Sequence, residues 1–246
     1  MSEVISIYDV TTTLANIDAN KARLFVFGGL ALICNFIYFG AGIYQGFKHK
    51  VFSMPVCATL IFIPHDLLYL MMFDKWFNVY DHWFCQLFWV GLIITNLEEF
   101  LFLYLTLKYG RKELMPQVSQ RTFQTLVLLG LAGVFVAWYA IKSVLADELW
   151  LFTFGWTVWF CIPFVIPMML RRNSAVGNST LMWGAYIGMA LCYWAAVWPL
   201  APFFRSPAWL ALGALVVVWA LAVIVVMKKL QSGSPVKDLG AVAAAS

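Results

Sequence analysis

Charged residues are scarce in this chain of 246 residues, where Asp, Glu, Lys and Arg make up 11% and hydrophobic residues 63%. Soluble domains carry roughly 25% charged residues, so the composition excludes a water-soluble enzyme and predicts no nucleic-acid partner. A cleavable signal peptide is also lacking, because residues 1–23 are polar and have no apolar core. We therefore expect membrane insertion to use the first apolar segment.

Other residue patterns are absent too. The sequence has no metal-type cysteine spacing, so its five cysteines are predicted to be packing residues and no metal or cofactor is expected. A retinal protein needs a lysine in the middle of its last helix, and residues 206–227 contain none. A transporter built from two similar halves would show an internal repeat, which we do not find. A receptor with short loops is a remaining alternative.

Long apolar blocks are what the sequence does contain. Each block is long enough to cross ~30 Å of hydrocarbon as a helix. The sequence predicts an all-α fold, a polytopic integral membrane bundle of seven transmembrane helices (24–229), with a polar N-terminal segment (1–23) and a disordered C-terminal tail (230–246). The seven predicted spans are 24–46, 51–73, 83–107, 122–144, 149–170, 179–203 and 207–227.

Basic residues favour alternate loops. They lie between the first and second spans, the third and fourth, the fifth and sixth, and after the seventh, at Lys48, Lys50, Lys108, Arg111, Lys112, Arg121, Arg171, Arg172, Lys228 and Lys229. By the positive-inside rule, this pattern predicts a cytoplasmic C-terminus and an N-terminus outside. The expected location is a bacterial inner membrane or a membrane like that of the endoplasmic reticulum.

Three acids lie inside the apolar spans: Asp66 in the second, and Glu98 and Glu99 in the third. Each costs ~2.5 to 3.5 kcal/mol at mid-helix on insertion scales and is retained mainly for function. Burial disfavours the charged form, so such a carboxyl group can act as a proton donor. Adjacent residues point about 100° apart on a helix, so only one of the two glutamates is expected to face a cavity. Polar contacts between helices are the alternative role for all three.

His65 and several aromatic residues complete the candidate site. His65 precedes Asp66 and is expected either to orient or re-protonate it, or to be a polar residue that forms a hydrogen bond between helices. Aromatic faces stabilise a developing cation, so aromatics near Asp66 suit chemistry through carbocations. The predicted catalytic residues are Asp66, Glu98, Glu99 and His65, and the predicted substrate-binding residues are Phe62, Tyr69, Phe73, Trp89 and Trp159. Membrane-interface anchoring and core packing are the alternative roles of the aromatics.

Three stretches resemble the membrane-embedded terpene cyclases of meroterpenoid and indole-diterpene biosynthesis. Residues 54–69 resemble that family's Met-Pro start and the later block that carries its essential acid, at the position of Asp66. Residues 104–114 resemble its Tyr-Gly turn, and residues 167–179 its Met-Leu-x-x-Arg and Gly-Gln-Ser run. Together they lie within residues 51–190.

The resemblance implies an enzyme that protonates a prenyl epoxide or terminal alkene, without a metal or nucleotide, and cyclises it through cations. Asp66 would be the general acid. The family's last-helix acid has no counterpart in residues 207–227, so the second acid is either absent or supplied by Glu98 or Glu99. The expected activity is cyclisation or isomerisation of a hydrophobic terpenoid or prenylated substrate that enters from the membrane lipids. A non-enzymatic lipid- or terpenoid-binding protein or transporter is the alternative.

Overall fold

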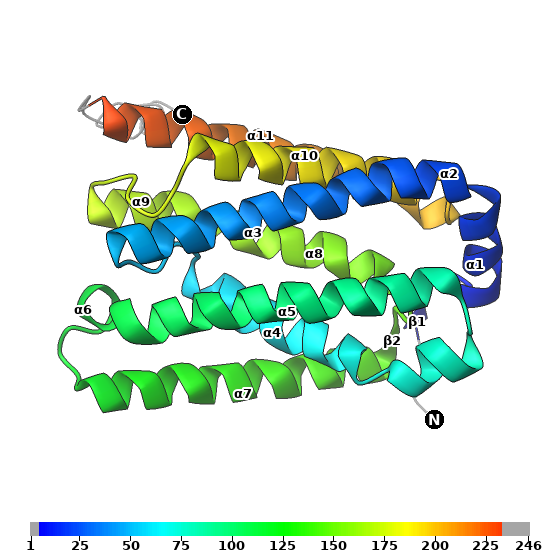
Figure 1. Ribbon diagram of the computed structural model, residues 1–246, viewed down its shortest axis with the longest axis horizontal. Coiled ribbons are helices and arrows are strands. Elements are labelled where there is room, and N and C mark those ends of the chain that lie inside the picture. Colours follow the sequence, from blue (N-terminus) through cyan, green and yellow to red (C-terminus); the bar gives the residue numbers. More distant parts are fainter. Residues whose placement is uncertain (1–4, 233–246) are drawn as a thin grey trace.

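The protein is a bundle of long helices that run between two ends (Figure 1). The structure is a computed structural model and describes residues 5–232. Its elements are β1 (Ile5–Ser6), α1 (Val10–Ala19), α2 (Lys21–Arg23), η1 (Leu24–Gly28), α3 (Gly29–His49), α4 (Val56–Leu70), η2 (Lys75–Val79), α5 (Trp83–Tyr109), α6 (Arg111–Leu114), α7 (Gln120–Val144), β2 (Leu145–Ala146), α8 (Leu151–Cys161), η3 (Ile162–Phe164), α9 (Val165–Arg172), α10 (Thr180–Val197), η4 (Pro202–Arg205) and α11 (Pro207–Gln231). The predicted all-α class is confirmed, with one short strand pair added.

Six helical stretches of the described chain are long and apolar enough to cross a membrane. They are Lys21–His49, Trp83–Tyr109, Gln120–Val144, Leu151–Arg172, Thr180–Val197 and Pro207–Gln231. Each coincides with one of the predicted spans. The protein is therefore a multi-pass integral membrane protein.

The remaining predicted span, 51–73, contains the shorter helix α4. Its 15 residues cover about 22 Å at 1.5 Å per residue, less than the ~30 Å thickness of the hydrocarbon. The helix is nevertheless mostly buried and packs against α5, α7 and α8. A helix enclosed by others need not match the bilayer thickness, because protein rather than lipid surrounds its ends. A count of seven spans stays a prediction.

Pro64 interrupts the hydrogen-bond ladder of α4 just before the predicted acid. A proline inside a helix has no N–H to donate and kinks the chain. Trp138 of α7 donates from its indole Nε1 to the Ile61 carbonyl oxygen at 3.1 Å. This bond ties the middle of α4 to α7, next to the site described below.

Two glycines let tryptophans enter the contacts among α8, α10 and α11. A Cβ atom on Gly155 would lie 2.3 Å from the Trp209 ring, and one on Gly213 would lie 2.5 Å from the Trp194 ring. The rings of Trp194 and Trp209 stack with centroids 5.0 Å apart. Small residues at helix contacts, which let neighbouring groups approach closely, are typical of membrane bundles.

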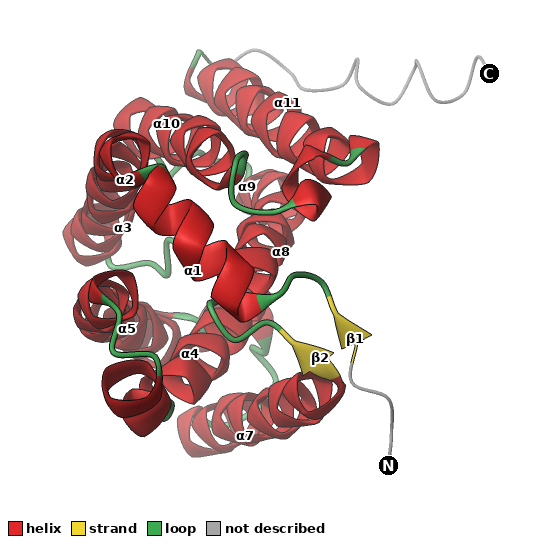
Figure 2. Ribbon diagram, turned by 90° about the vertical axis from the view of Figure 1, so that its right-hand side faces the viewer, coloured by secondary structure: helices red, strands yellow, loops and turns green. Residues whose placement is uncertain are grey.

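The N-terminal segment closes one end of the bundle. Helix α1 lies across this end, beside the β1–β2 pair (Figure 2). Its Ile17 is fully buried, and Asn16 donates from its side-chain amide to the Leu200 carbonyl oxygen at 2.9 Å. The strands pair in parallel, Ile5 opposite Leu145, and bring residues 5–8 to the α7–α8 connection. The polar stretch 1–23 thus contains a structured cap, with residues 1–4 outside the described range.

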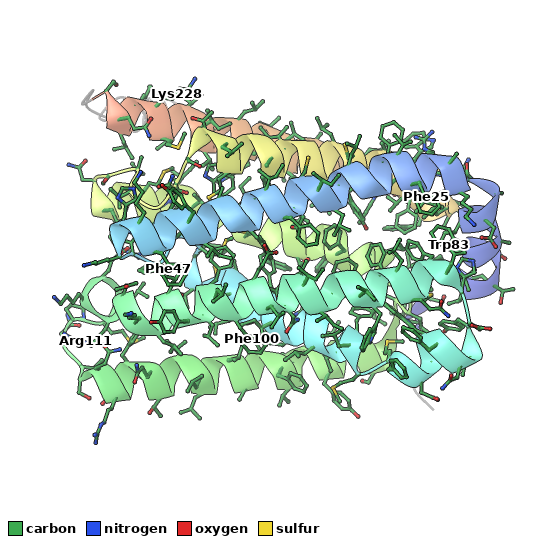
Figure 3. All side chains as sticks on the ribbon, in the orientation of Figure 1. Phe25, Phe47, Trp83, Phe100, Arg111 and Lys228 are labelled. Carbon is green, nitrogen blue, oxygen red and sulfur yellow. The ribbon has the colours of Figure 1, made fainter. Side chains whose placement is uncertain are left out.

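The opposite end is basic. Arg111 and Lys228 lie at this end, whereas Phe25 and Trp83 lie at the capped end (Figure 3). Glu113 of α6 accepts hydrogen bonds from Arg171 at 2.5 Å and from Arg172 at 2.8 Å. Helix α11 continues to Gln231, two residues into the range predicted to be a tail, and residues 233–246 lie outside the described residues.

Candidate functional site

A cavity of about 160 Å³ lies among α3, α4, α5, α8 and α10, toward the capped end. Its walls are mainly apolar, and its aromatic lining includes Tyr38, Phe39, Phe62, Phe88, Trp150 and Phe154. The hydroxyls of its lining tyrosines are turned to other partners, since Tyr186 donates to the Val158 carbonyl and Tyr193 to the Leu151 carbonyl. These tyrosines therefore line the cavity with their rings and not with their hydroxyls. The polar lining residues are Asn35, Asp66, Thr95, Glu99 and Thr157.

The cavity reaches the lateral surface of the bundle between η1–α3 and α5. Two of its lining side chains, Phe25 and Leu87, are 53% and 51% exposed. Phe25 stacks on Trp83, also a lining residue, with ring centroids 5.1 Å apart. In a membrane-spanning bundle this lateral surface faces lipid, so the cavity has an apolar entrance.

Asp66 is the acid of α4 that lines the cavity, and it is 5% exposed. Its Oδ2 accepts a hydrogen bond from the Thr95 hydroxyl at 3.3 Å, and its Oδ1 lies 2.8 Å from His65 Nδ1. One carboxyl oxygen thus faces α5 and the other faces His65. The side chain joins the cavity to a polar network behind it.

The structure separates the two glutamates of α5. Glu99 is 3% exposed, lines the cavity one helical turn after Thr95, and interacts electrostatically with Asp66. Glu99 Oε2 has no partner among the described residues. Glu98 points to another face, is partly exposed and does not line the cavity. Of the two alternatives, Glu99 is the cavity residue.

His65 lies behind Asp66 and is fully buried. Its Nε2 lies 2.8 Å from the Thr153 hydroxyl oxygen, and Trp150 donates from Nε1 to its Nδ1 at 2.9 Å. The ring also packs edge-on against Trp138, with centroids 5.0 Å apart. Although adjacent helical residues point in different directions, the imidazole bends back to reach the Asp66 carboxyl.

Asp147 ends this polar network and is 2% exposed. Its carboxyl group accepts from the Thr153 hydroxyl at 2.6 Å, from the Tyr8 hydroxyl at 2.5 Å and from the backbone N–H groups of Phe152 and Thr153 at 3.1 and 2.6 Å. The N–H groups belong to the first turn of α8, where an acceptor satisfies otherwise unpaired donors. Asp147 therefore anchors the start of α8 beneath the N-terminal segment.

The predicted aromatic residues separate into three groups. Phe62 lines the cavity. Tyr69 lies in the polar network instead, where its hydroxyl donates to the Asp147 carbonyl oxygen at 2.6 Å and the Lys142 Nζ lies 3.3 Å from its ring centroid. The other predicted aromatics do not line the cavity: Phe73 and Trp89 pack against each other at 5.2 Å, and Trp159 packs against Trp219.

Sequence reasoning missed several polar members of the site: Tyr8, Asn35, Thr95, Asp147 and Thr153. Thr95 was detectable, because it stands four residues before Glu99 and shares its helical face. Asp147 also carried a signal, since an acid shortly before an apolar helix is a typical capping residue. Tyr8 carried none, because its role depends on the pairing of β1 with β2.

Tyr8 and Asp18, which lie outside the spanning helices, have shifted pKa values. Burial raises the pKa of the Tyr8 hydroxyl well above its usual value, and the neighbouring Asp147 raises it further. Tyr8 therefore stays protonated and donates to Asp147. At the edge of the cap, the Trp83 indole N–H holds the pKa of the Asp18 carboxyl below its usual value.

Comparison of the chain with known protein families, curated proteins and solved structures gave no match. Among residues 5–232, no three His, Cys, Asp or Glu side chains are grouped as metal ligands. The expectation of metal-free chemistry stays a prediction. Functional assignment depends on the cavity and its polar groups.

Proposed function

We propose that the protein is a membrane-embedded enzyme that starts a cyclisation or isomerisation by protonating an apolar terpenoid or prenylated substrate. The observation that carries this proposal is the position of Asp66, which lines an apolar, aromatic cavity at the one side and contacts a polar network at the other. A proton donor held in a dry aromatic cavity suits reactions through cations.

In the proposed reaction, the Asp66 carboxylic acid transfers its proton to an epoxide oxygen or an alkene carbon of the substrate. The electron-deficient carbon then forms a bond with a neighbouring double bond. Loss of a proton from an adjacent carbon ends the sequence, and Asp66 or Glu99 accepts it. One proton enters and one leaves, so the product is an isomer of the substrate.

Aromatic faces around the cavity support the cationic steps. Each suitably placed ring stabilises a cation by roughly 0.5 to 2 kcal/mol. Phe62 comes from the same helix as Asp66, one turn before it, while Phe39 and Phe154 approach from α3 and α8. Exclusion of water by these walls protects a carbocation from premature hydration.

The lateral opening between η1–α3 and α5 supports entry of the substrate from the bilayer. Exposed apolar side chains form both sides of this opening, with Phe25 on η1 and Leu87 on α5. A prenyl chain would leave lipid for an apolar cavity of similar polarity, so little desolvation is needed. The carboxyl pair Asp66 and Glu99 would meet its reactive end.

The distribution of basic residues supports an orientation for this enzyme. Ten of the basic side chains belong to the loops and helix ends at the end opposite α1, the ten given above for the alternate loops. With α4 counted as a seventh span, this end and the C-terminus would face the cytoplasm. The cap formed by α1 and the Asp147 network would then lie on the outer side.

The terpene cyclase resemblance fits this reading at the level of residues. The position that resembles the family's essential acid is Asp66, which lines the cavity. Glu99, beside it, is the candidate second acid in place of the acid lacking in the last helix. Glu98 is no longer needed for that role.

The test is incubation of membranes containing the protein with a panel of prenyl epoxides and terminal polyenes, followed by mass spectrometry. The proposal expects conversion of at least one compound to a product of equal mass and different retention. If the protein retains a compound unchanged through purification and converts none of the panel, the non-enzymatic binding function is favoured instead.

A further inference from the structure

The Thr153 hydroxyl stands between two titratable side chains of the polar network. Its oxygen lies 2.6 Å from Asp147 Oδ2 and 2.8 Å from His65 Nε2. The Tyr69 hydroxyl is a third neighbour at 3.0 Å, and its own proton goes to the Asp147 carbonyl oxygen at 2.6 Å. A hydroxyl has a single proton to donate and two lone pairs to accept with. If Thr153 donates its proton to Asp147 or to His65, it can only accept a hydrogen bond from the other.

The donors around Asp147 show where the Thr153 proton goes. The backbone N–H groups of Phe152 and Thr153 can only donate, and both point at this carboxyl group. Tyr8 accepts from the Leu149 N–H at 3.0 Å and gives its own proton to Asp147. A carboxyl group that receives only donors is an ionised carboxylate. Thr153 therefore donates to Asp147 as well.

Thr153 can then only accept a hydrogen bond from His65, so His65 Nε2 carries a hydrogen. The other ring nitrogen, Nδ1, receives the Trp150 indole N–H at 2.9 Å. A hydrogen on Nδ1 would face the indole hydrogen across this short distance, so Nδ1 is the unprotonated acceptor. Asp66 Oδ1 lies 2.8 Å from the same Nδ1. Two acceptors at that distance repel, whereas a proton on Asp66 Oδ1 would share the single Nδ1 lone pair with the indole N–H in a three-centre hydrogen bond.

We infer that Asp147 is a positioning residue that acts through Thr153: it fixes His65 as the neutral Nε2–H tautomer and so keeps the proton on Asp66. Three side chains in direct hydrogen-bond contact, Asp147, Thr153 and His65, connect the N-terminal cap to Asp66 in the cavity. It deepens the proposed function and rests on it, because the reaction needs Asp66 to be protonated before the substrate binds.

Two further charged side chains face this network. From α5, the Glu99 carboxyl lies against Asp66, where a second negative charge would be repelled. From α7, Lys142 interacts with both Asp147 and Asp66 and stabilises a negative charge on either. Lys142 thus favours the ionised Asp147, whereas repulsion within the Glu99–Asp66 pair favours a proton on one of those two carboxyl groups.

The test uses the full-length protein in lipid nanodiscs with ¹⁵N-labelled histidine, and it requires no substrate. The chain has three histidines, so the ring nitrogens of His65 are assignable with a His65→Gln variant. Nitrogen chemical shifts distinguish the two neutral tautomers from the imidazolium. Infrared difference spectra against Asp66→Asn report the carbonyl stretch of a protonated Asp66.

We expect wild-type His65 to be the Nε2–H tautomer and the protonated carboxyl band to be present. Thr153→Val, which keeps the shape and removes the hydroxyl, is expected to mix the tautomers and weaken that band, while Thr153→Ser retains both signals. Thr59→Val is the matched control, because Thr59 is a buried threonine of α4 whose hydroxyl has no partner among the described residues.

An imidazolium or an Nδ1–H tautomer in the wild type would overturn the inference without any variant. Thr153→Val spectra identical to those of Thr59→Val would overturn it too. Both readouts are independent of turnover, so an inactive protein with the expected spectra would refute the proposed function alone. An active protein with the wrong tautomer would refute this inference alone.

Discussion

Trp150 Nε1 lies 2.9 Å from His65 Nδ1 and donates its hydrogen to the nitrogen that also faces Asp66. Trp150 precedes α8 with a left-handed backbone, φ 65°, so the turn into the helix aims the indole back at α4. The contact holds the histidine ring in place behind the acid.

Replacing Trp150 with Phe keeps the aromatic body and removes the N–H donor. We expect the free energy of unfolding to fall by about 0.5 to 1.5 kcal/mol, the usual net value of one hydrogen bond. Thermal unfolding in detergent measures this, with Trp219→Phe as control, because the Trp219 N–H has no partner among the described residues. Equal stability of Trp150→Phe and wild type would show that the bond contributes nothing.

Glu98→Gln and Glu99→Gln form a matched pair of adjacent substitutions. General acid or base catalysis contributes about 10²- to 10⁴-fold, so Glu99→Gln should lower turnover within that range. Glu98→Gln should retain turnover, because Glu98 does not line the cavity. Initial rates on a converted substrate measure both. A larger loss in Glu98→Gln would reverse the assignment of the second acid.

Gly91 lines the cavity at its lateral opening, where a Cβ atom would lie 3.9 Å from Leu32 Cδ1. Gly91→Leu should therefore fill the opening and raise KM for a prenyl substrate. Gly133→Leu on α7 is the control, because a Cβ atom there would meet no atom within 4 Å. Steady-state kinetics measure KM for both variants. Equal KM values would argue against substrate entry between η1–α3 and α5.

The cap should loosen at low pH through Asp18. The Trp83 indole N–H holds the Asp18 pKa below its usual value, so folding favours the ionised form. The resulting stabilisation is present above the unfolded pKa of about 3.9 and is lost as the pH falls through the lower folded pKa. We expect Asp18→Asn to lower the thermal stability at pH 7 and to bring it closer to that of wild type in strong acid. A stability difference unchanged with pH would contradict this linkage.

The membrane class and the acids of the site were predictable because both depend on local sequence. Runs of about twenty apolar residues define spans by themselves, and an acid inside such a run stands out at once. The helical repeat also showed that Glu98 and Glu99 face different ways. Which of them faces inward depends on how α5 packs against α4, and the helical repeat carries no information about that packing.

The polar network was not predictable, because it depends on contacts between distant segments. Tyr8 and Asp147 are 139 positions apart and meet only because β1 pairs with β2. The sequence around Asp147 therefore indicated a helix-capping acid at most, and not a member of a network with Tyr8. The predicted aromatics Phe73, Trp89 and Trp159 stand in apolar spans, but the direction in which such side chains point depends on helix packing.

The central claim is that Asp66 supplies the proton that starts the reaction. The most direct measurement is the single-turnover rate of wild type and Asp66→Asn with the same prenyl substrate, together with the binding of that substrate by each. The account predicts that Asp66→Asn still binds the substrate in the cavity and converts it at least about 100-fold more slowly, the lower range for loss of a general acid. Equal rates in the two proteins would contradict it.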